Sequence, residues 1–255
     1  SSSDQAAPDA TPIYTLLEAI DSITPPPRAP DLPLRVPIFQ SVQVHGVGTV
    51  AIGRIVQGTL KRGESVILSP GDLQCEVTSI EQYHVDRSVA MPGDIIGFRV
   101  KGATLASLHR GMVASPRTQP VPAVLSFTAQ VIVLSHPGTL RVGYTPFFMC
   151  HTASFPARFV KLLQKIDRRS GAVLEENPTE VRRGDCVTVQ LQVLNNRPVC
   201  LERHVDCAAL GRFVIRDSSF TVGVGVVRSI DETAGMALKA KKTSSRPVKS
   251  KYFRS

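Results

Sequence analysis

The chain of 255 residues is 42% hydrophobic and 20% charged, which excludes an intrinsically disordered protein and leaves enough apolar residues for one large or two ordinary domains. No run of about 18 apolar residues occurs, so no segment is expected to span a bilayer. The net charge of +9 at pH 7 favours an anionic partner such as RNA. The five cysteines form no Cys-x-x-Cys pair, which argues against a zinc site and for a reducing compartment.

Residues 1–30 are predicted to form a flexible lead followed by a short helix. Ser1–Thr11 is rich in Ser, Ala, Asp and Pro and has little to bury. Thr15 and Glu18 have the spacing of a capping box, which predicts a helix that continues to about Ile23, before three consecutive prolines. A helix of two turns is too short to be stable alone, so we expect it to be the remnant of an upstream domain against which it packs.

A stretch punctuated by glycines, from Gly46 to Gly63, dominates the first half of the chain. The residues between its glycines are largely β-branched and apolar, with no helical spacing, which predicts strands. Gly48, Gly53 and Gly58 recur every five residues, as is typical of a strand that bends sharply or lets another backbone come close. The stretch therefore predicts the corner of a small barrel.

One turn template recurs later: a glycine turn, an acid and then a strand of alternating apolar and polar residues. The three copies are Lys61–Val66, Met91–Ile96 and Arg182–Val187. Many short strands with glycine turns and almost no helix predict an all-β fold of two tandem β-barrels, each with six or seven strands. We place the barrels at residues 31–118 and 122–231, joined by the proline-rich linker Pro116–Pro122.

The sequence contains no motif that would indicate an enzyme. It contains no Gly-x-x-x-x-Gly-Lys-Ser/Thr loop, the backbone cradle that holds a nucleotide phosphate in many NTPases. Its histidines have no Ser/Asp or Cys partner at catalytic spacing, and no metal site is expected. We therefore predict that this chain holds no cofactor and neither binds nor hydrolyses GTP.

Residues 232–255 form a basic tail that we predict to be disordered. It holds seven Lys/Arg and one acid, and so carries six of the nine net positive charges. Two interpretations stay open for it, a solvated tail that aids solubility and an arm that binds RNA in a salt-sensitive way.

Several blocks of the sequence carry a resemblance to a known family. Gly46–Gly63 resembles the hairpin of the first β-barrel that follows the GTPase domain in translational GTPases. The blocks of the second half, in their order, resemble the last domain of eukaryotic and archaeal elongation factor 1-alpha. These blocks are Phe127–Gly138, Gly143–Pro146, Cys150–Ala153, Lys165–Gly171, Leu210–Phe213, Ile215–Asp217 and Thr221–Val227. Eukaryotic release factor three and the ribosome-rescue GTPases share the architecture but fit these blocks less well, and Leu16–Asp21 resembles the helix that closes the family's GTPase domain.

The resemblance implies a translation-factor barrel followed by an elongation factor C-terminal barrel, with GTP and magnesium bound by a GTPase domain that this chain lacks. It also implies a site for the aminoacylated 3′ end of tRNA on the first barrel. Glu81 matches the carboxylate that meets the terminal ribose, while Val47, Gly48 and Val50 would flank the terminal adenine. Ile95 stands where the family has an Asn that helps to hold the esterified amino acid, and Gln40 stands near a usual acid, so both departures weaken the case for charged tRNA.

On the second barrel, the resemblance places His136, Arg212 and Arg216 on or near the acceptor and T stems of tRNA. Arginine suits phosphate because its guanidinium makes bidentate contacts. For Arg212 and Arg216, a structural salt bridge to Asp217 or Glu202 is an equally good interpretation.

Two functional hypotheses follow. The first is that the barrels bind tRNA and partners in GTP-dependent delivery of aminoacyl-tRNA to the ribosome, in the cytoplasm and away from membranes. Its implied partners are tRNA, the ribosome, the upstream GTPase domain and a nucleotide-exchange factor on the first barrel. The alternative is a divergent paralogue that acts as a protein-interaction scaffold, like a release or rescue factor or through an exchange factor, without delivering charged tRNA.

Overall fold

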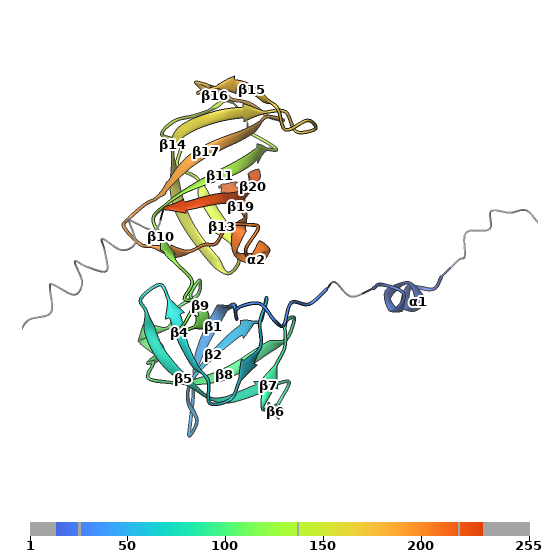
Figure 1. Cartoon of the computed structure of the whole chain (residues 1–255), viewed down its shortest axis with the longest axis vertical. Helices are drawn as coiled ribbons and strands as arrows, with labels where there is room; N and C mark the ends of the chain where they lie inside the picture. Colours follow the sequence, from blue (N-terminus) through green and yellow to red (C-terminus); the bar gives the residue numbers. More distant parts are fainter. Residues whose placement is uncertain (1–13, 25–26, 137, 219, 232–255) are drawn as a thin grey trace, which may run out of the picture.

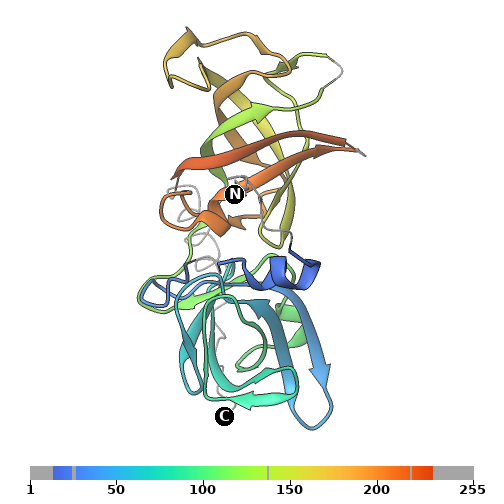
Figure 2. The ribbon, with the colours of Figure 1, turned by 90° about the vertical axis from the view of Figure 1, so that its right-hand side faces the viewer.

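The chain folds into two β-barrels stacked along its longest axis, the first below the second in Figure 1 and again in Figure 2 after a turn of 90°. The computed structural model describes residues 14–24, 27–136, 138–218 and 220–231. The predicted lead up to Thr11 and the predicted basic tail 232–255 lie outside the described residues. None of the helices in the described part of the chain is long and apolar enough to cross a membrane.

Helix α1 (Leu16–Asp21) begins at the capping box predicted from the sequence. The Thr15 hydroxyl accepts the backbone N–H of Glu18 at 3.3 Å, and the Glu18 carboxylate accepts the backbone N–H of Thr15 at 2.8 Å. The helix ends at Asp21, before the expected Ile23, and none of its residues is buried. The described residues also include two short helical segments, a 3₁₀ turn at Leu105–Ser107 and helix α2 (Ala208–Gly211).

The first barrel closes through six antiparallel strands in the order β4-β9-β1-β2-β8-β5, with β5 pairing back to β4. These strands are β1 (Val36–Val44), β2 (Gly48–Arg54), β4 (Ser65–Ser69), β5 (Leu73–Gln82), β8 (Ile95–Lys101) and β9 (Val113–Pro116). Strand β6 (Val85–Arg87) extends the edge of β5, and β3 (Leu60–Lys61) pairs with β7 (Val89–Ala90).

The second barrel closes in the same way, through six strands in the order β13-β19-β20-β11-β17-β14, with β14 pairing back to β13. These strands are β11 (Ser126–Val133), β13 (Phe147–Cys150), β14 (Ala153–Ile166), β17 (Cys186–Val193), β19 (Arg212–Asp217) and β20 (Phe220–Asp231). Smaller pairs are β10 (Ala123–Val124) with β18 (Val199–Cys200), β12 (Leu140–Arg141) with β16 (Glu180–Val181), and β15 (Val173–Glu176) with β14. The prediction of two tandem barrels is therefore confirmed.

Alternation along the strands fills each barrel with apolar side chains. In β11 every second residue is buried, beginning with Phe127, and in β8 the residues Ile96, Phe98 and Val100 point inward. Aromatic rings dominate the second core, where the centroids of Phe148 and Phe213 lie 5.3 Å apart.

Two of the three glycines that recur every five residues, Gly53 and Gly58, let another backbone come close as the sequence predicted, whereas Gly48 lies against the side chain of Arg99. A Cβ added to Gly58 would lie 2.5 Å from the backbone of Leu34, and one added to Gly53 would lie 2.7 Å from the carbonyl oxygen of Pro37. Any side chain at either position would displace the neighbouring segment.

The repeated turn template forms the same hydrogen-bonded turn each time. The acid that follows the glycine accepts the backbone N–H of the residue three positions earlier, at 3.1 Å for Glu64, 2.8 Å for Asp94 and 2.8 Å for Asp185. The glycine before each acid has a positive φ, between 84° and 98°. The acid therefore fixes the turn from which the next strand begins.

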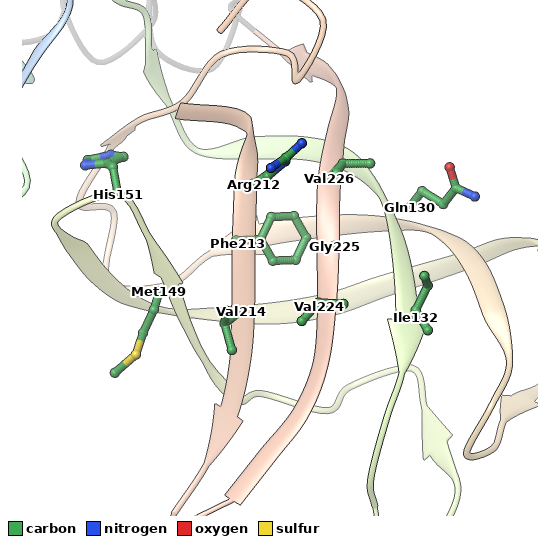
Figure 3. A pocket seen from close by; sticks show the side chains of 10 residues that line it. All are labelled: Gln130, Ile132, Met149, His151, Arg212, Phe213, Val214, Val224, Gly225 and Val226. Carbon is green, nitrogen blue, oxygen red and sulfur yellow. The ribbon is translucent and has the colours of Figure 1, made fainter. Parts of the chain in front are cut away.

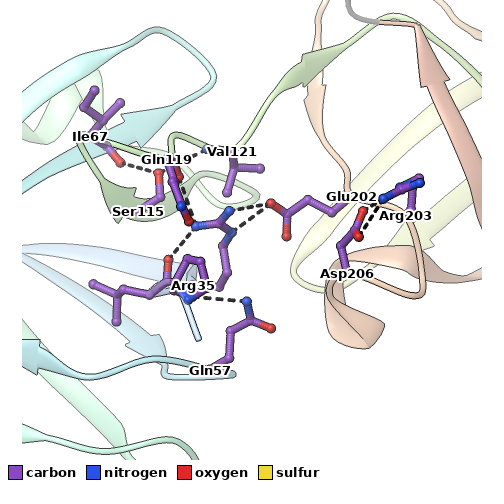
Figure 4. A network of polar contacts seen from close by, with 11 residues as sticks. Arg35, Gln57, Ile67, Ser115, Gln119, Val121, Glu202, Arg203 and Asp206 are labelled. Atoms are coloured by element: carbon purple, nitrogen blue, oxygen red, sulfur yellow. Dashed lines mark hydrogen bonds and ion pairs between the residues drawn. The ribbon is translucent and has the colours of Figure 1, made fainter. Parts of the chain in front are cut away.

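A buried ion pair, shown in Figure 4, and a small apolar cluster hold the two barrels together. Arg35, which precedes β1, donates from Nε and Nη2 to Oε1 of Glu202 at 2.9 and 2.6 Å, and its Nη1 donates to the carbonyl oxygens of Leu34 and Gln119. The apolar cluster beside the ion pair consists of Val113, Val121, Cys200, Cys207 and Leu210.

A second contact between the barrels comes from the hairpin that joins β13 to β14. There the Thr152 hydroxyl donates to the carbonyl oxygen of Ile38 at 2.8 Å, and Nε of Arg110 donates to the carbonyl oxygen of Thr152 at 2.9 Å. The barrels are thus joined at two places by hydrogen bonds from side chains.

Candidate functional site

A cavity of about 350 Å³ lies on the outward face of the first barrel. It is lined by residues of β1, β2, β5 and β8 and of the loops next to them: Val42, Val44, Val47, Val50, Ile52, Ser79, Glu81, Tyr83, His84, Ile95, Ile96, Gly97 and Arg99. The walls are largely apolar and carry few charged groups, the composition typical of small-ligand sites, whose volumes run from about 300 to 1,000 Å³.

Gly97 forms the floor of this cavity because it brings no side chain to the outward face. It lies between Ile52 on β2 and Glu81 on β5, which are its partners in the register of the sheet. A Cβ added to Gly97 would lie 3.4 Å from Cγ1 of Val50, an ordinary van der Waals contact. A methyl group would therefore fit at this position, whereas a longer side chain would fill the cavity.

Four of the six residues expected at the tRNA 3′ end line this one cavity: Val47, Val50, Glu81 and Ile95. Gly48 lies at its edge under the guanidinium of Arg99, whose Nε is 3.4 Å from the position of a Cβ on Gly48. Gln40 is exposed on β1 opposite Ile52 and does not line the cavity.

Of the nine lining residues that the sequence analysis did not name for this site, three carry a charged or aromatic side chain: Arg99, Tyr83 and His84. Arg99 is exposed and makes no ion pair with any residue in the described ranges, so the cavity holds a cation whose charge is not compensated by a neighbour. The alternation of β8 could have found it, because Arg99 follows Gly97 by two positions and so lies on the same outward face.

Glu81 is the carboxylate of the cavity, and it faces a histidine. Its Oε1 lies 3.5 Å from Nδ1 of His84, and the two side chains are 60% and 100% exposed. Such an exposed pair contributes little to stability, so the carboxylate remains accessible to a ligand. A ribose hydroxyl is a suitable donor for it.

A second, larger groove of about 590 Å³ lies on the second barrel, over β11, β13, β19 and β20 (Figure 3). Its surface is mostly apolar, with Ile132, Met149, Val214, Val224 and Val226 among the lining residues. The polar side chains at its margin are Gln130, His151 and Arg212. Arg212 is exposed and forms no ion pair within the described part of the chain, which disfavours the salt-bridge interpretation of this residue.

The other two residues expected at the tRNA stems do not line this groove. The His136 ring packs edge-on against Tyr144, with centroids 5.4 Å apart, and Arg216 on β19 pairs with Phe147 on β13. The two acids considered as salt-bridge partners also have other contacts: Glu202 pairs with Arg35, and Asp217 accepts a hydrogen bond from the Tyr144 hydroxyl at 2.8 Å. Burial and the Asp217 carboxylate raise the pKa of Tyr144 well above its usual value.

The cysteines offer no reactive or metal-binding site. All five thiols are free and buried, and burial raises the pKa of Cys150 to about 12. Within the described ranges, no group of three or more His, Cys, Asp or Glu side chains could hold a metal ion.

Comparison with known proteins gives the two barrels separate matches. Residues 48–115 match the family described as elongation factor Tu domain 2, and residues 126–228 match the GTP-eEF1A C-terminal domain-like family. Elongation factor 1-alpha of Neurospora crassa is 42% identical over 236 residues, which cover 92% of this chain and 51% of that protein. Elongation factor 1-alpha-A of Schizosaccharomyces pombe is 42% identical over 231 residues, which cover 90% of this chain and 50% of that protein.

Solved structures agree with this result. The structure of Sup35 complexed with GMPPNP is similar at a TM-score of 0.74 and 32% identity, over 87% of this chain and 54% of that one. Sup35 complexed with GDP is similar at a TM-score of 0.73 and 32% identity, over 84% of this chain and 51% of that one. The chain thus spans about half the length of the relatives it matches, and over its two barrels it belongs to the elongation factor Tu and 1-alpha family of translation factors.

Proposed function

We propose that the two barrels bind RNA, with the cavity of the first barrel receiving the 3′ end of tRNA. The observation that carries this proposal is the position of Glu81, whose carboxylate lines a largely apolar cavity and whose partner in the sheet is Gly97, a residue without a side chain. The barrel that holds this cavity matches elongation factor Tu domain 2. In this arrangement the carboxylate accepts a hydrogen bond from the terminal ribose, while Val47 and Val50 pack against the base.

The second barrel would bind the neighbouring stems of the same tRNA through Arg212 and Arg216, with His136 nearby. Arginine on an outer barrel face suits RNA phosphates, because these contacts fix position without reading sequence. In the longer relatives this half of the protein would work beside a GTPase domain, which supplies the chemistry of GTP and magnesium. The whole protein would then act on the ribosome, in the cytoplasm, with an exchange factor docking on the first barrel.

The cavity itself can be tested by filling it. Gly97→Leu should weaken binding of tRNA to the 255-residue chain at least tenfold, because the leucine occupies the volume meant for the terminal nucleoside. Gly97→Ala is the matched control, since its methyl group meets Val50 at an ordinary contact distance of 3.4 Å and should leave affinity within about twofold. Equal affinity of all three proteins would show that RNA binds elsewhere.

Arg99 adds an electrostatic test of the same site. If its guanidinium contacts a phosphate next to the terminal nucleoside, Arg99→Gln should lower the slope of log affinity against log salt by about 0.7, the value for one contact to a single strand. An unchanged slope would mean that Arg99 does not contact phosphate.

The alternative, a protein-interaction scaffold without delivery of charged tRNA, is favoured by one observation. Ile95 is 46% exposed and presents an apolar side chain to the cavity where the resemblance has an amide. On this basis the chain should bind aminoacylated and deacylated tRNA with equal affinity. Ile95→Asn should create a preference for the aminoacylated form of up to about tenfold. Strong discrimination by the unmodified chain would count against the loss of this contact.

A further inference from the structure

The turn that joins β5 to β6 holds two aromatic residues in an unfavourable backbone conformation. Gln82 pairs with Val85, so Tyr83 and His84 are the two turn residues, and their φ angles are +51° and +65°. A two-residue hairpin turn with positive φ at both positions is a type I′ turn, which favours Asn-Gly or Gly-Gly. Bulky residues are rare there because their Cβ atoms crowd the backbone, and such outliers cluster at functional sites.

The folded barrel makes no evident use of the Tyr83 side chain. Tyr83 is 80% exposed, and its hydroxyl forms no hydrogen bond to any residue that the structure describes. Packing and hydrogen bonding within the barrel therefore do not account for an aromatic residue at a position that would suit asparagine better.

Both turn residues do face the candidate cavity. Tyr83 and His84 line it together with Glu81, and Nδ1 of His84 lies 3.5 Å from the Glu81 carboxylate. The turn thus brings an exposed aromatic ring next to the carboxylate proposed to meet the terminal ribose. Arg99 lies farther from the turn, because its partner on β5 is Ser79, whereas Glu81 is opposite Gly97.

We propose that Tyr83 is a stacking platform for a nucleobase of the single-stranded RNA 3′ end; this inference rests on the proposed function. Every base has a flat π face, so stacking on a tyrosine tolerates any sequence and suits a protein that must accept many RNAs. The ring is exposed and can receive a base on its face, and the two-residue turn sets the backbone position from which it projects.

The test uses the 255-residue chain and a short RNA that carries a 5′ fluorophore and ends in adenosine with a free 2′,3′-diol. Tyr83→Asn should weaken binding about 5- to 150-fold, which corresponds to about 1–3 kcal/mol for the loss of one stacked base. The slope of log affinity against log salt should stay unchanged, because no phosphate contact is removed. The same substitution should raise the melting temperature, since asparagine tolerates positive φ.

Tyr83→Phe is the matched control, and it should keep the affinity of the unmodified chain because the ring is retained. Gly97→Leu separates this inference from the proposed function. If Gly97→Leu weakens binding and Tyr83→Asn does not, the stacking role is wrong while the RNA site stands. If neither substitution weakens binding, both proposals fail, and if Tyr83→Phe loses as much as Tyr83→Asn, the hydroxyl and not the ring makes the contact.

Discussion

The buried side chain of His151 is expected to make the stability of the second barrel depend on pH in the acid range. It lies in the hairpin between β13 and β14, where its Nε2 is 3.0 Å from the carbonyl oxygen of Cys200 and its Nδ1 is 3.2 Å from the Thr152 hydroxyl. Burial of the ring lowers the pKa of His151 from 6.5 to about 4, and the Cys200 carbonyl offsets this only in part. The native barrel therefore prefers the neutral ring.

The sign of the effect on stability follows from this shift. Between pH 4 and pH 6.5 the unfolded chain binds more protons at His151 than the folded chain does. The free energy of unfolding therefore has its full value above pH 6.5 and decreases as the pH falls to 4. The loss should be about 3 kcal/mol or less. Unfolding free energies of the chain and of His151→Asn, measured by urea denaturation across this range, should differ in their slope against pH. Parallel curves would contradict the assignment.

The resemblance predicted Glu81, Val47, Val50 and Ile95 at one site, and the cavity brings those four side chains together. The sequence could not predict that Tyr83 lines this cavity, since its position depends on which residues fall in a two-residue turn. The choice of turn residues is set by the pairing of Gln82 with Val85, which no local sequence pattern specifies.

At the scale of elements, the three glycine-acid turns are the most regular feature of the fold. Asp94→Ala removes the acceptor for the backbone N–H of Met91 at 2.8 Å, in the turn that starts β8. We expect a loss of about 1 kcal/mol in the free energy of unfolding, the usual net value of one hydrogen bond. Asp94→Asn should recover most of it, because its amide oxygen can accept the same bond. Chemical denaturation of the three proteins measures this, and an Asp94→Ala protein as stable as the parent would refute the role of the turn.

Strands and turns were predictable because their information is local. Period-two alternation predicts β8 and β17, and a glycine at a turn predicts a positive φ. The sequence predicted that the strands form barrels, but not which strands pair to close them. The pairings of β4 with β9 and of β13 with β19 join segments that lie far apart in the sequence, and the sequence pattern leaves their register open.

At the scale of the whole molecule, the buried pair of Arg35 and Glu202 makes the two barrels depend on each other. Their side chains are only 7% and 10% exposed, so removing one partner leaves a charge that water cannot solvate. Glu202→Ala should therefore cost about 3–5 kcal/mol, whereas Arg35→Met with Glu202→Leu should recover much of this loss, because an apolar pair needs no compensation.

The measurement is denaturation followed by both circular dichroism and tyrosine fluorescence. Asp86→Ala is a suitable control, because it removes the exposed partner of Arg62 and should change stability by less than about 1 kcal/mol. If Glu202→Ala is no more costly than Asp86→Ala, the junction does not contribute to stability as described.

The distribution of the five buried thiols has a practical consequence for following the motion of this molecule. Cys75 lies in the core of the first barrel, Cys186 lies in β17 of the second, and Cys200 and Cys207 lie between them. A thiol reagent can modify each one only when its surroundings open, so the rates of labelling report separately on each barrel and on the junction. The native cysteines therefore serve as chemical probes, and their labelling rates show whether the two barrels separate from one another before either of them unfolds.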